Sequence, residues 1–168
     1  MQQKLKASEV IYKNKVFLLK DYRKDTHKQT EVEKRIFNLR VSDDLSLWEI
    51  DKKLLIKQFD ELLVRASAIT GVSLQKQPLF FDLFKDELIT YLLDFGYESL
   101  TLAEILYAFK LNTMVYVKYA SGMEVPKVDL FGEFISVDYV SRLLYTYKIL
   151  RDTLDSKVRN SIEGYATF

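Results

Sequence analysis

The chain has 168 residues, of which 48% are apolar and 29% charged, enough for one domain with a buried core. It contains no cysteine and one histidine, which excludes disulfides, iron–sulfur clusters and zinc sites built from cysteine and histidine. The 5 glycines and 2 prolines leave few tight turns and favour helices. The composition therefore predicts a mainly α-helical fold, a bundle of about five to six helices.

The net charge of +1 conceals a segregation of charge along the chain. Residues 1–40 carry 11 Lys and Arg against 5 Asp and Glu, and the remainder has an acidic excess. We therefore expect a basic N-terminal arm or helical segment over residues 1–40 and a helical core domain over residues 41–160. A basic arm is compatible with DNA contact, although a solvated charged helix is the simpler interpretation.

The N-terminal segment lacks the apolar stretch of a secretory signal. No segment approaches the roughly 18 consecutive apolar residues of a transmembrane helix. These two features predict a cytoplasmic protein with no membrane partner.

The first forty residues contain neither glycine nor proline, so periodicity must define their elements. Apolar residues that follow Ser8 fit either an amphipathic helix capped by this serine or a short hairpin through Asn14. The polar run over residues 24–30 predicts a break or a loop. A second amphipathic piece follows it, from Val32 to Leu39.

The clearest predicted helix follows Ser42, Asp43 and Asp44, whose side chains suit helix caps. Its core stripe at helical spacing comprises Trp48, Leu55, Phe59, Leu62, Ala66 and Ile69. Three further residues widen this stripe, namely Leu47, Ile50 and Leu54. Gly71 is suited to the left-handed residue that ends the helix.

Pro78 suits the first turn of a further helix that ends at Gly96. The apolar residues that recur at helical spacing in this helix are Phe80, Phe84, Leu88, Tyr91, Leu92 and Phe95. Another helix is predicted to begin at Thr101, because the T-x-x-E spacing with Glu104 is typical of a capping box.

Residues 112–133 interrupt the helical pattern and predict one short strand or an ordered loop near residues 114–133. Ser136 then caps a final helix whose inward stripe is predicted to be Val140, Leu143, Leu144, Tyr147, Leu150 and Leu154. Its cations are predicted to lie outside or at the rim of the core, namely Arg142, Lys148, Arg151 and Lys157.

The sequence offers no set of residues from which a catalytic centre could be assembled. Its glycines lie too far apart for a phosphate-binding loop, and His27 lies in a polar run typical of a solvated side chain. Asp44, Asp51 and Lys53 match a metal-dependent nuclease in composition only, because they fall near the start of a predicted helix. We therefore expect a non-enzymatic protein with no cofactor, no catalytic residue and no metal ligand.

Two groups of residues are candidates for binding. The acidic residues Asp82, Asp86 and Glu87 predict a partner-binding patch, with a plain solvent face as the alternative. In the last helix, Tyr145 and Tyr147 mix with two cations, as in stacking platforms for single strands, although tyrosines more often bury their rings. The predicted DNA contacts are Lys13, Lys15, Lys20, Arg23, Lys24, Lys34, Arg35, Lys148 and Arg151.

Two stretches carry a resemblance to a known group of proteins. LTLAEILYAFKLN at residues 100–112 and FISVDYVSRLLYTYK at residues 134–148 resemble small helical proteins of gut-bacterial phages. In those proteins an E-I-x-x-A-F helix precedes an irregular segment, an F-S cap and a helix that ends in L-x-x-Y-K. Their genes often lie beside replication genes, and the proteins are thought to act as replisome organisers or helicase-loader-like factors.

The resemblance implies a phage protein, located in the bacterial host cell, that binds a replicative helicase, DNA, or both, and it implies no catalytic residues. The alternative is an inhibitor or adaptor of a host or defence protein, or a packing subunit of a virion, without DNA contact. The crowding of Phe80, Phe81 and Phe84 is also compatible with a homo-oligomer.

Overall fold

The computed structural model describes residues 4–22, 30–113, 117–118, 124–125, 128–129 and 132–164. These residues form five α-helices, short 3-10 segments and two small antiparallel sheets of two strands each. The prediction of a mainly α-helical fold is confirmed.

The chain begins with a hairpin of β1 (Glu9–Tyr12) and β2 (Lys15–Leu18). Lys13 and Asn14 join the strands with φ angles of 49° and 61°, the left-handed pair that a two-residue hairpin turn needs. Of the two alternatives for this segment, the hairpin is therefore correct and the helix is wrong.

The second amphipathic piece is α1 (Glu31–Arg40), which Thr30 caps through its side chain. Its buried residues Ile36 and Phe37 belong to the same hydrophobic core as Val10 and Leu19 around the hairpin. This core also includes residues from all the later α-helices. The described part of residues 1–40 is thus packed against the helical body.

The next helix, α2 (Lys52–Thr70), begins later than predicted. Ser46 instead caps a 3-10 turn over Leu47–Glu49, and Asp51 caps α2 by accepting a hydrogen bond from the Lys53 amide at 3.2 Å. Ser46 and Asp51 therefore begin two separate helical segments, where the periodicity predicted a single helix. The helix ends as predicted at Gly71, which has a φ of 73°.

Four residues assigned to the α2 stripe are therefore placed differently, since Leu47, Trp48 and Ile50 all precede the helix. Trp48 lies in the 3-10 turn, where its indole N–H donates to the Leu5 carbonyl at 2.8 Å. Leu54 lies in the first turn of α2 and is 48% exposed. The predicted residues Leu55, Phe59, Leu62 and Ala66 are buried.

Pro78 occupies the first turn of α3 (Pro78–Asp94), as predicted. Of the apolar residues that recur at helical spacing, Leu88 and Leu92 are buried, whereas Phe80 and Phe95, near the two ends of the helix, are 50% and 66% exposed.

The following helix, α4 (Leu102–Leu111), has the predicted capping box. The Glu104 carboxylate accepts from the Thr101 amide at 2.9 Å, and the Thr101 hydroxyl accepts from the Glu104 amide at 3.1 Å.

Two short strands, β3 (Val117–Lys118) and β4 (Glu124–Val125), pair antiparallel where one strand or a loop was expected. Ser136 caps α5 (Val137–Ile162), the longest helix in the described residues. All six residues of its predicted inward stripe are buried.

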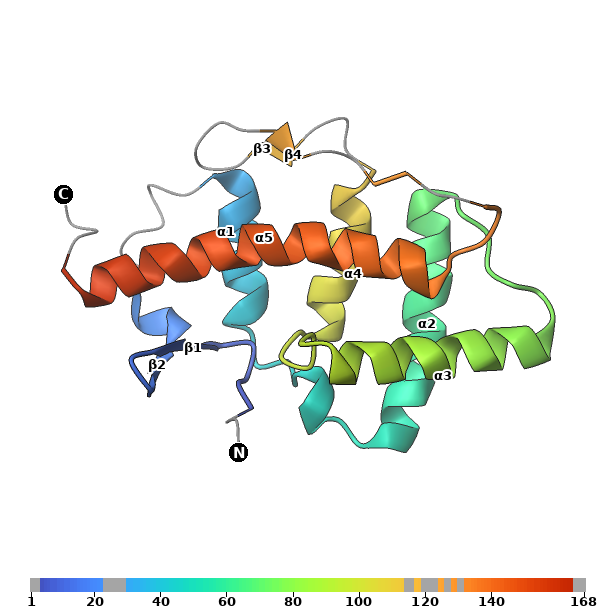
Figure 1. Ribbon diagram of the computed structural model, residues 1–168, viewed down its shortest axis with the longest axis horizontal. Helices are drawn as coiled ribbons and strands as arrows, with labels where there is room; N and C mark the ends of the chain where they lie inside the picture. The colour runs from blue at the N-terminus through green and yellow to red at the C-terminus, as the bar shows by residue number, and fades with distance from the viewer. Residues whose placement is uncertain are drawn as a thin grey trace.

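The helices form two crossed layers (Figure 1). α5 and α3 run across one face of a layer made of α1, α4 and α2, with α5 over α1 and α4 and with α3 over α2. The hydrophobic core includes Phe59, Phe109, Leu92 and Leu144, which come from both layers. The N-terminal end of α3 extends past α2 at the edge of the molecule, so its first turns have no helix beside them on that side.

Candidate functional site

The predicted DNA contacts in the hairpin do not all remain available to a phosphate. The Lys13 ammonium lies 2.6 Å from a carboxylate oxygen of Glu163, which follows α5. Hydrogen bonds from Lys13 and Tyr12 lower the pKa of Glu163. Lys15 and Lys20 are exposed.

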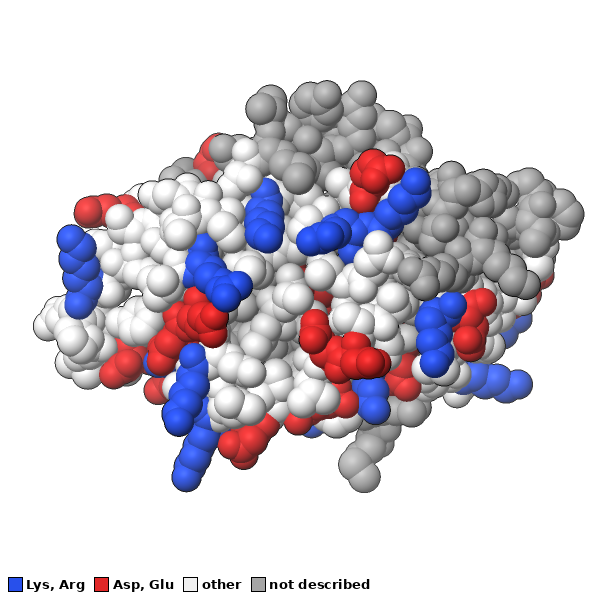
Figure 2. All heavy atoms as spheres, turned by 180° about the vertical axis from the view of Figure 1, so that it is seen from behind, with Lys and Arg blue, Asp and Glu red and all other residues white. Residues whose placement is uncertain are grey.

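The other cations of the first forty residues are dispersed. Lys34 pairs with Glu31 at 3.3 Å, and Arg35 is exposed on α1. Arg23, Lys24 and His27 lie outside the described residues. Figure 2 shows the face opposite to that of Figure 1, where Lys and Arg are interspersed with Asp and Glu. No continuous basic surface forms among the described residues of this face.

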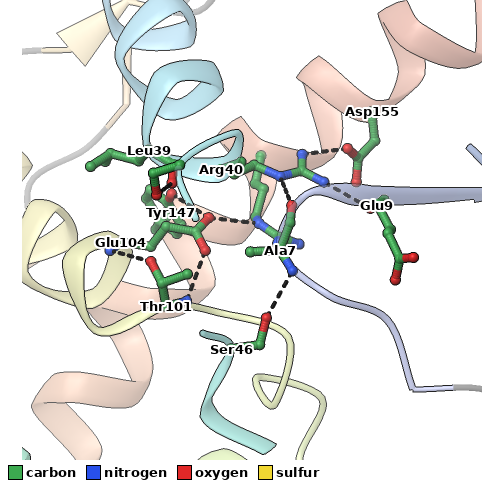
Figure 3. Close-up of polar contacts among 11 residues, drawn as sticks. Ala7, Glu9, Leu39, Arg40, Ser46, Thr101, Glu104, Tyr147 and Asp155 are labelled. Atoms are coloured by element: carbon green, nitrogen blue, oxygen red, sulfur yellow. Dashed lines mark hydrogen bonds and ion pairs between the residues drawn. The ribbon is translucent and has the colours of Figure 1, made fainter. Parts of the chain in front are cut away.

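Arg151 lies at the rim of the core, one of the two places predicted for it, but its guanidinium is bound to a buried carboxylate. Its Nε donates to Glu104 at 2.9 Å, and its side chain is 11% exposed. Tyr147 donates to the same carboxylate oxygen at 2.8 Å, as Figure 3 shows. Burial disfavours the charged form of Arg151, but the charges of Glu104 and Asp155 raise its pKa. Its buried Nη2 has no hydrogen-bond partner in the described structure.

A second cation, Arg40, is fully buried and joins the hairpin to α5. Its Nη1 lies 2.5 Å from Asp155, while Nε donates to the Ala7 carbonyl at 2.8 Å and Nη2 to the Glu9 carbonyl at 3.2 Å (Figure 3). Burial and the nearby charge of Arg151 lower the pKa of Arg40. These contacts give Arg40 and Arg151 a structural role, because their hydrogen bonds are directed to groups inside the protein.

Lys148 is the predicted contact on α5 that remains exposed. Its ammonium lies 5.8 Å from the centre of the Tyr97 ring. Nearby, Tyr91, Tyr97 and Tyr145 line an open hollow of about 530 Å³ with Arg142 and Asp129, among others.

A different surface combines exposed apolar and acidic side chains on α3. Leu79, Phe80 and Leu83 are 63%, 50% and 52% exposed, which is unusual for three large apolar side chains within two helical turns. The predicted acidic residues are exposed on the same helix, with Asp82 and Asp86 three residues after Leu79 and Leu83 and with Glu87 four residues after Leu83. We call this surface the α3 face; it comprises Leu79, Phe80, Asp82, Leu83, Asp86 and Glu87.

The buried side of α3 explains why this face points outward. Leu88, Ile89 and Leu92 pack in the core, and Lys85 is 6% exposed. The Lys85 ammonium lies 2.5 Å from Asp60 of α2 and 3.8 Å from Asp82. Because the Lys85 ammonium is bound to Asp60 of α2, it does not neutralise the charges of Asp86 and Glu87. These two carboxylates form no ion pair with any described residue.

The exposure of the α3 face leads to a prediction about stability. Replacing Phe80 with serine should lower the free energy of unfolding by only about 1 kcal/mol, because half of the ring is already exposed to solvent. Leu92→Ala in the buried half of the same helix should cost about 2–5 kcal/mol. Urea denaturation compares the two variants. A loss at Phe80 as large as the loss at Leu92 would show that this ring belongs to the core.

The sequence located the acidic half of the α3 face and missed its apolar half. The available signal was the apolar crowding at the start of α3, which the sequence related only to a homo-oligomer. Asp44, Asp51 and Lys53, which match a nuclease in composition, have local structural roles instead. Asp51 caps α2 by accepting from the Lys53 amide, and Asp44 accepts from the Ser42 hydroxyl at 3.1 Å.

Within the described residues, no group of three or more acidic or histidine side chains is arranged to hold a metal ion. No described helix has the length and hydropathy required to span a bilayer. Comparisons with family models, with curated proteins and with solved structures find no match for the chain. Its function must therefore be argued from its surfaces.

Proposed function

We propose that this protein is non-enzymatic and acts by binding a partner protein through the α3 face. The observation that carries the proposal is the exposure of Leu79, Phe80 and Leu83 at a helix end that extends past α2 (Figure 1). Apolar side chains clustered in this way are typical of protein interfaces. The flanking acids, Asp82, Asp86 and Glu87, would form a polar rim around the apolar centre.

The resemblance to phage replication-region proteins suggests a replicative helicase as the partner. The test is a pull-down with purified helicase from the phage or host that encodes the chain. We expect the wild-type chain to retain the helicase and the double variant Leu79→Ser/Leu83→Ser to lose it. Asp138→Ala, which removes an exposed acid from α5, is the matched control and should retain it.

Two results would contradict this proposal in different ways. Failure of the wild-type chain to retain the helicase would remove that partner. Equal retention by wild type and by Leu79→Ser/Leu83→Ser would remove the α3 face as the docking surface.

DNA contact is a second candidate function, supported by the aromatic surface at the α3–α5 edge. Phe95 and Tyr145 are 66% and 63% exposed, and exposed Lys148 lies close to Tyr97. Aromatic rings beside cations can stack the bases of a single strand, at about 1–3 kcal/mol per base. This function is the second candidate because acidic side chains near the surface would repel phosphates. Asp129 lines the hollow, and Asp152 lies close enough to Lys148 to interact with its charge.

Fluorescence anisotropy with labelled single-stranded and duplex DNA at low salt tests this second function. Binding should favour the single strand, weaken with salt and fall in the variants Tyr145→Ala and Lys148→Ala. No binding, or binding that does not depend on salt, would remove DNA as a partner.

A further inference from the structure

The α3 face carries negative charge with no exposed cation on the same helix. α3 contains four acidic residues, Asp82, Asp86, Glu87 and Asp94, and one cation, Lys85. All four acids are exposed, whereas Lys85 is buried against Asp60. The nearest cation in the sequence, Lys76, precedes the first turn of the helix. Lys85 also lies 3.8 Å from Asp82, so a partner on this helix meets apolar side chains beside the carboxylates of Asp86 and Glu87, whose charges no cation of α3 offsets.

The positions of these groups fit a helical partner. Leu79 and Leu83 are one turn apart, as are Leu83 and Glu87, and Asp82 and Asp86 form a parallel row beside them. A helix laid along α3 would place its own apolar residues on the leucines and its flanking residues beside the acidic row. Lys or Arg at these flanking positions would form complementary pairs, whereas Asp or Glu would be repelled.

The same charges oppose pairing with a second copy of this chain. In a two-fold symmetric dimer, the same patch is present on both subunits. Two α3 faces packed together would bring the row of Asp82 and Asp86 close to its own copy, along with both Glu87 carboxylates. Like charges at an interface disfavour association. Charge complementarity thus points to a different, cationic chain.

We propose that the α3 face binds a cationic amphipathic helix of another protein, with leucine-like residues on Leu79, Phe80 and Leu83 and with Lys or Arg beside Asp86 and Glu87. This inference rests on the proposed protein-binding function and specifies the chemistry of the partner. Because the α3 face is negatively charged, the rate of association with a cationic helix should fall as the salt concentration rises.

The test uses the full chain and three synthetic probe peptides measured by fluorescence anisotropy. The first is an amphipathic Leu/Lys helix, the second has Glu in place of every Lys, and the third has the Leu/Lys composition in scrambled order. We expect binding of the ordered Leu/Lys peptide to be at least about tenfold tighter than that of the other two, and to weaken with salt. Equal binding of the Leu/Glu peptide, or no binding of the Leu/Lys peptide, would overturn the inference.

Variants locate the probe on the protein. Asp86→Lys/Glu87→Lys should weaken binding of the Leu/Lys peptide by about tenfold or more and favour the Leu/Glu peptide, because the charge of the site is reversed. Asp138→Lys reverses an exposed acid on α5 and is the matched control for non-specific attraction. An effect at Asp138 as large as at Asp86 and Glu87 would place the peptide elsewhere and overturn the inference.

The results separate this inference from the broader proposal. Suppose that Leu79→Ser/Leu83→Ser abolishes helicase retention while the charge-reversal variant leaves it intact. The α3 face would then be a docking surface for a partner that is not cationic. If neither variant affects any partner or probe, both proposals fail.

Discussion

Replacing Glu104 with alanine is expected to lower the free energy of unfolding by about 3–5 kcal/mol, because it leaves a buried cation without its partner. The Glu104 side chain is fully buried and accepts hydrogen bonds from Arg151, Tyr147 and the Thr101 amide. Its loss would remove the Glu104 half of the capping box of α4, while the Thr101 hydroxyl would still cap the helix, and it would break the hydrogen bonds that Arg151 and Tyr147 of α5 donate to α4. Urea unfolding followed by circular dichroism measures the change.

Two companion variants identify the cause of this loss. Glu104→Gln keeps the size of the side chain and removes its charge, so it should cost less than alanine does. The double variant Glu104→Leu/Arg151→Met removes both charges and should recover part of the loss, since apolar replacements of buried pairs are often tolerated. Asp138→Ala, at an exposed pair with Arg142, should stay within about 1 kcal/mol. The structural role of Glu104 would be wrong if Glu104→Ala cost no more than Asp138→Ala.

Replacing Arg40 with alanine is expected to cost a similar amount, about 3–5 kcal/mol, and also to loosen the N-terminal hairpin. The Arg40 guanidinium joins Asp155 of α5 to the carbonyls of Ala7 and Glu9. Without it, the Asp155 carboxylate loses its buried counter-charge and the two carbonyls lose their donors. Part of the attachment of the hairpin to the body is lost with them.

Amide hydrogen exchange separates these two effects of Arg40→Ala. The paired amides of β1 and β2 should exchange faster relative to those of α4 than they do in the wild type, because the hairpin can open on its own. Arg159→Ala is a milder control that removes one hydrogen bond, from Nε to the Ile11 carbonyl, and should cost about 0.5–1.5 kcal/mol. Equal protection of the hairpin and α4 in Arg40→Ala would contradict the proposed role of Arg40.

Local chemistry was sufficient to predict many helix boundaries. Pro78 lacks the amide hydrogen that a first turn leaves unused, and Gly71 adopts the left-handed conformation at the end of α2. Thr101 and Glu104 satisfy each other's amides within one turn. Each of these features depends on residues that are neighbours in the sequence, so no distant contact was needed to predict them.

Other features depended on residues far apart in the chain. Arg151 and Glu104 are separated by 47 positions, and Arg40 and Asp155 by 115, so no local pattern shows that these cations are buried. A periodic stripe shows which residues of a helix share a face, but not how far the neighbouring helices extend along it.

For the candidate site, the sequence by itself determined that α3 is a helix with a row of acids on its surface. Only the tertiary structure decided that Phe80 is half-exposed, because the first turns of α3 extend past α2. It also decided that Lys85 is bound to Asp60 rather than to the α3 acids Asp86 and Glu87. Burial and charge compensation are properties of neighbours in space, and the fold brings those neighbours from other helices.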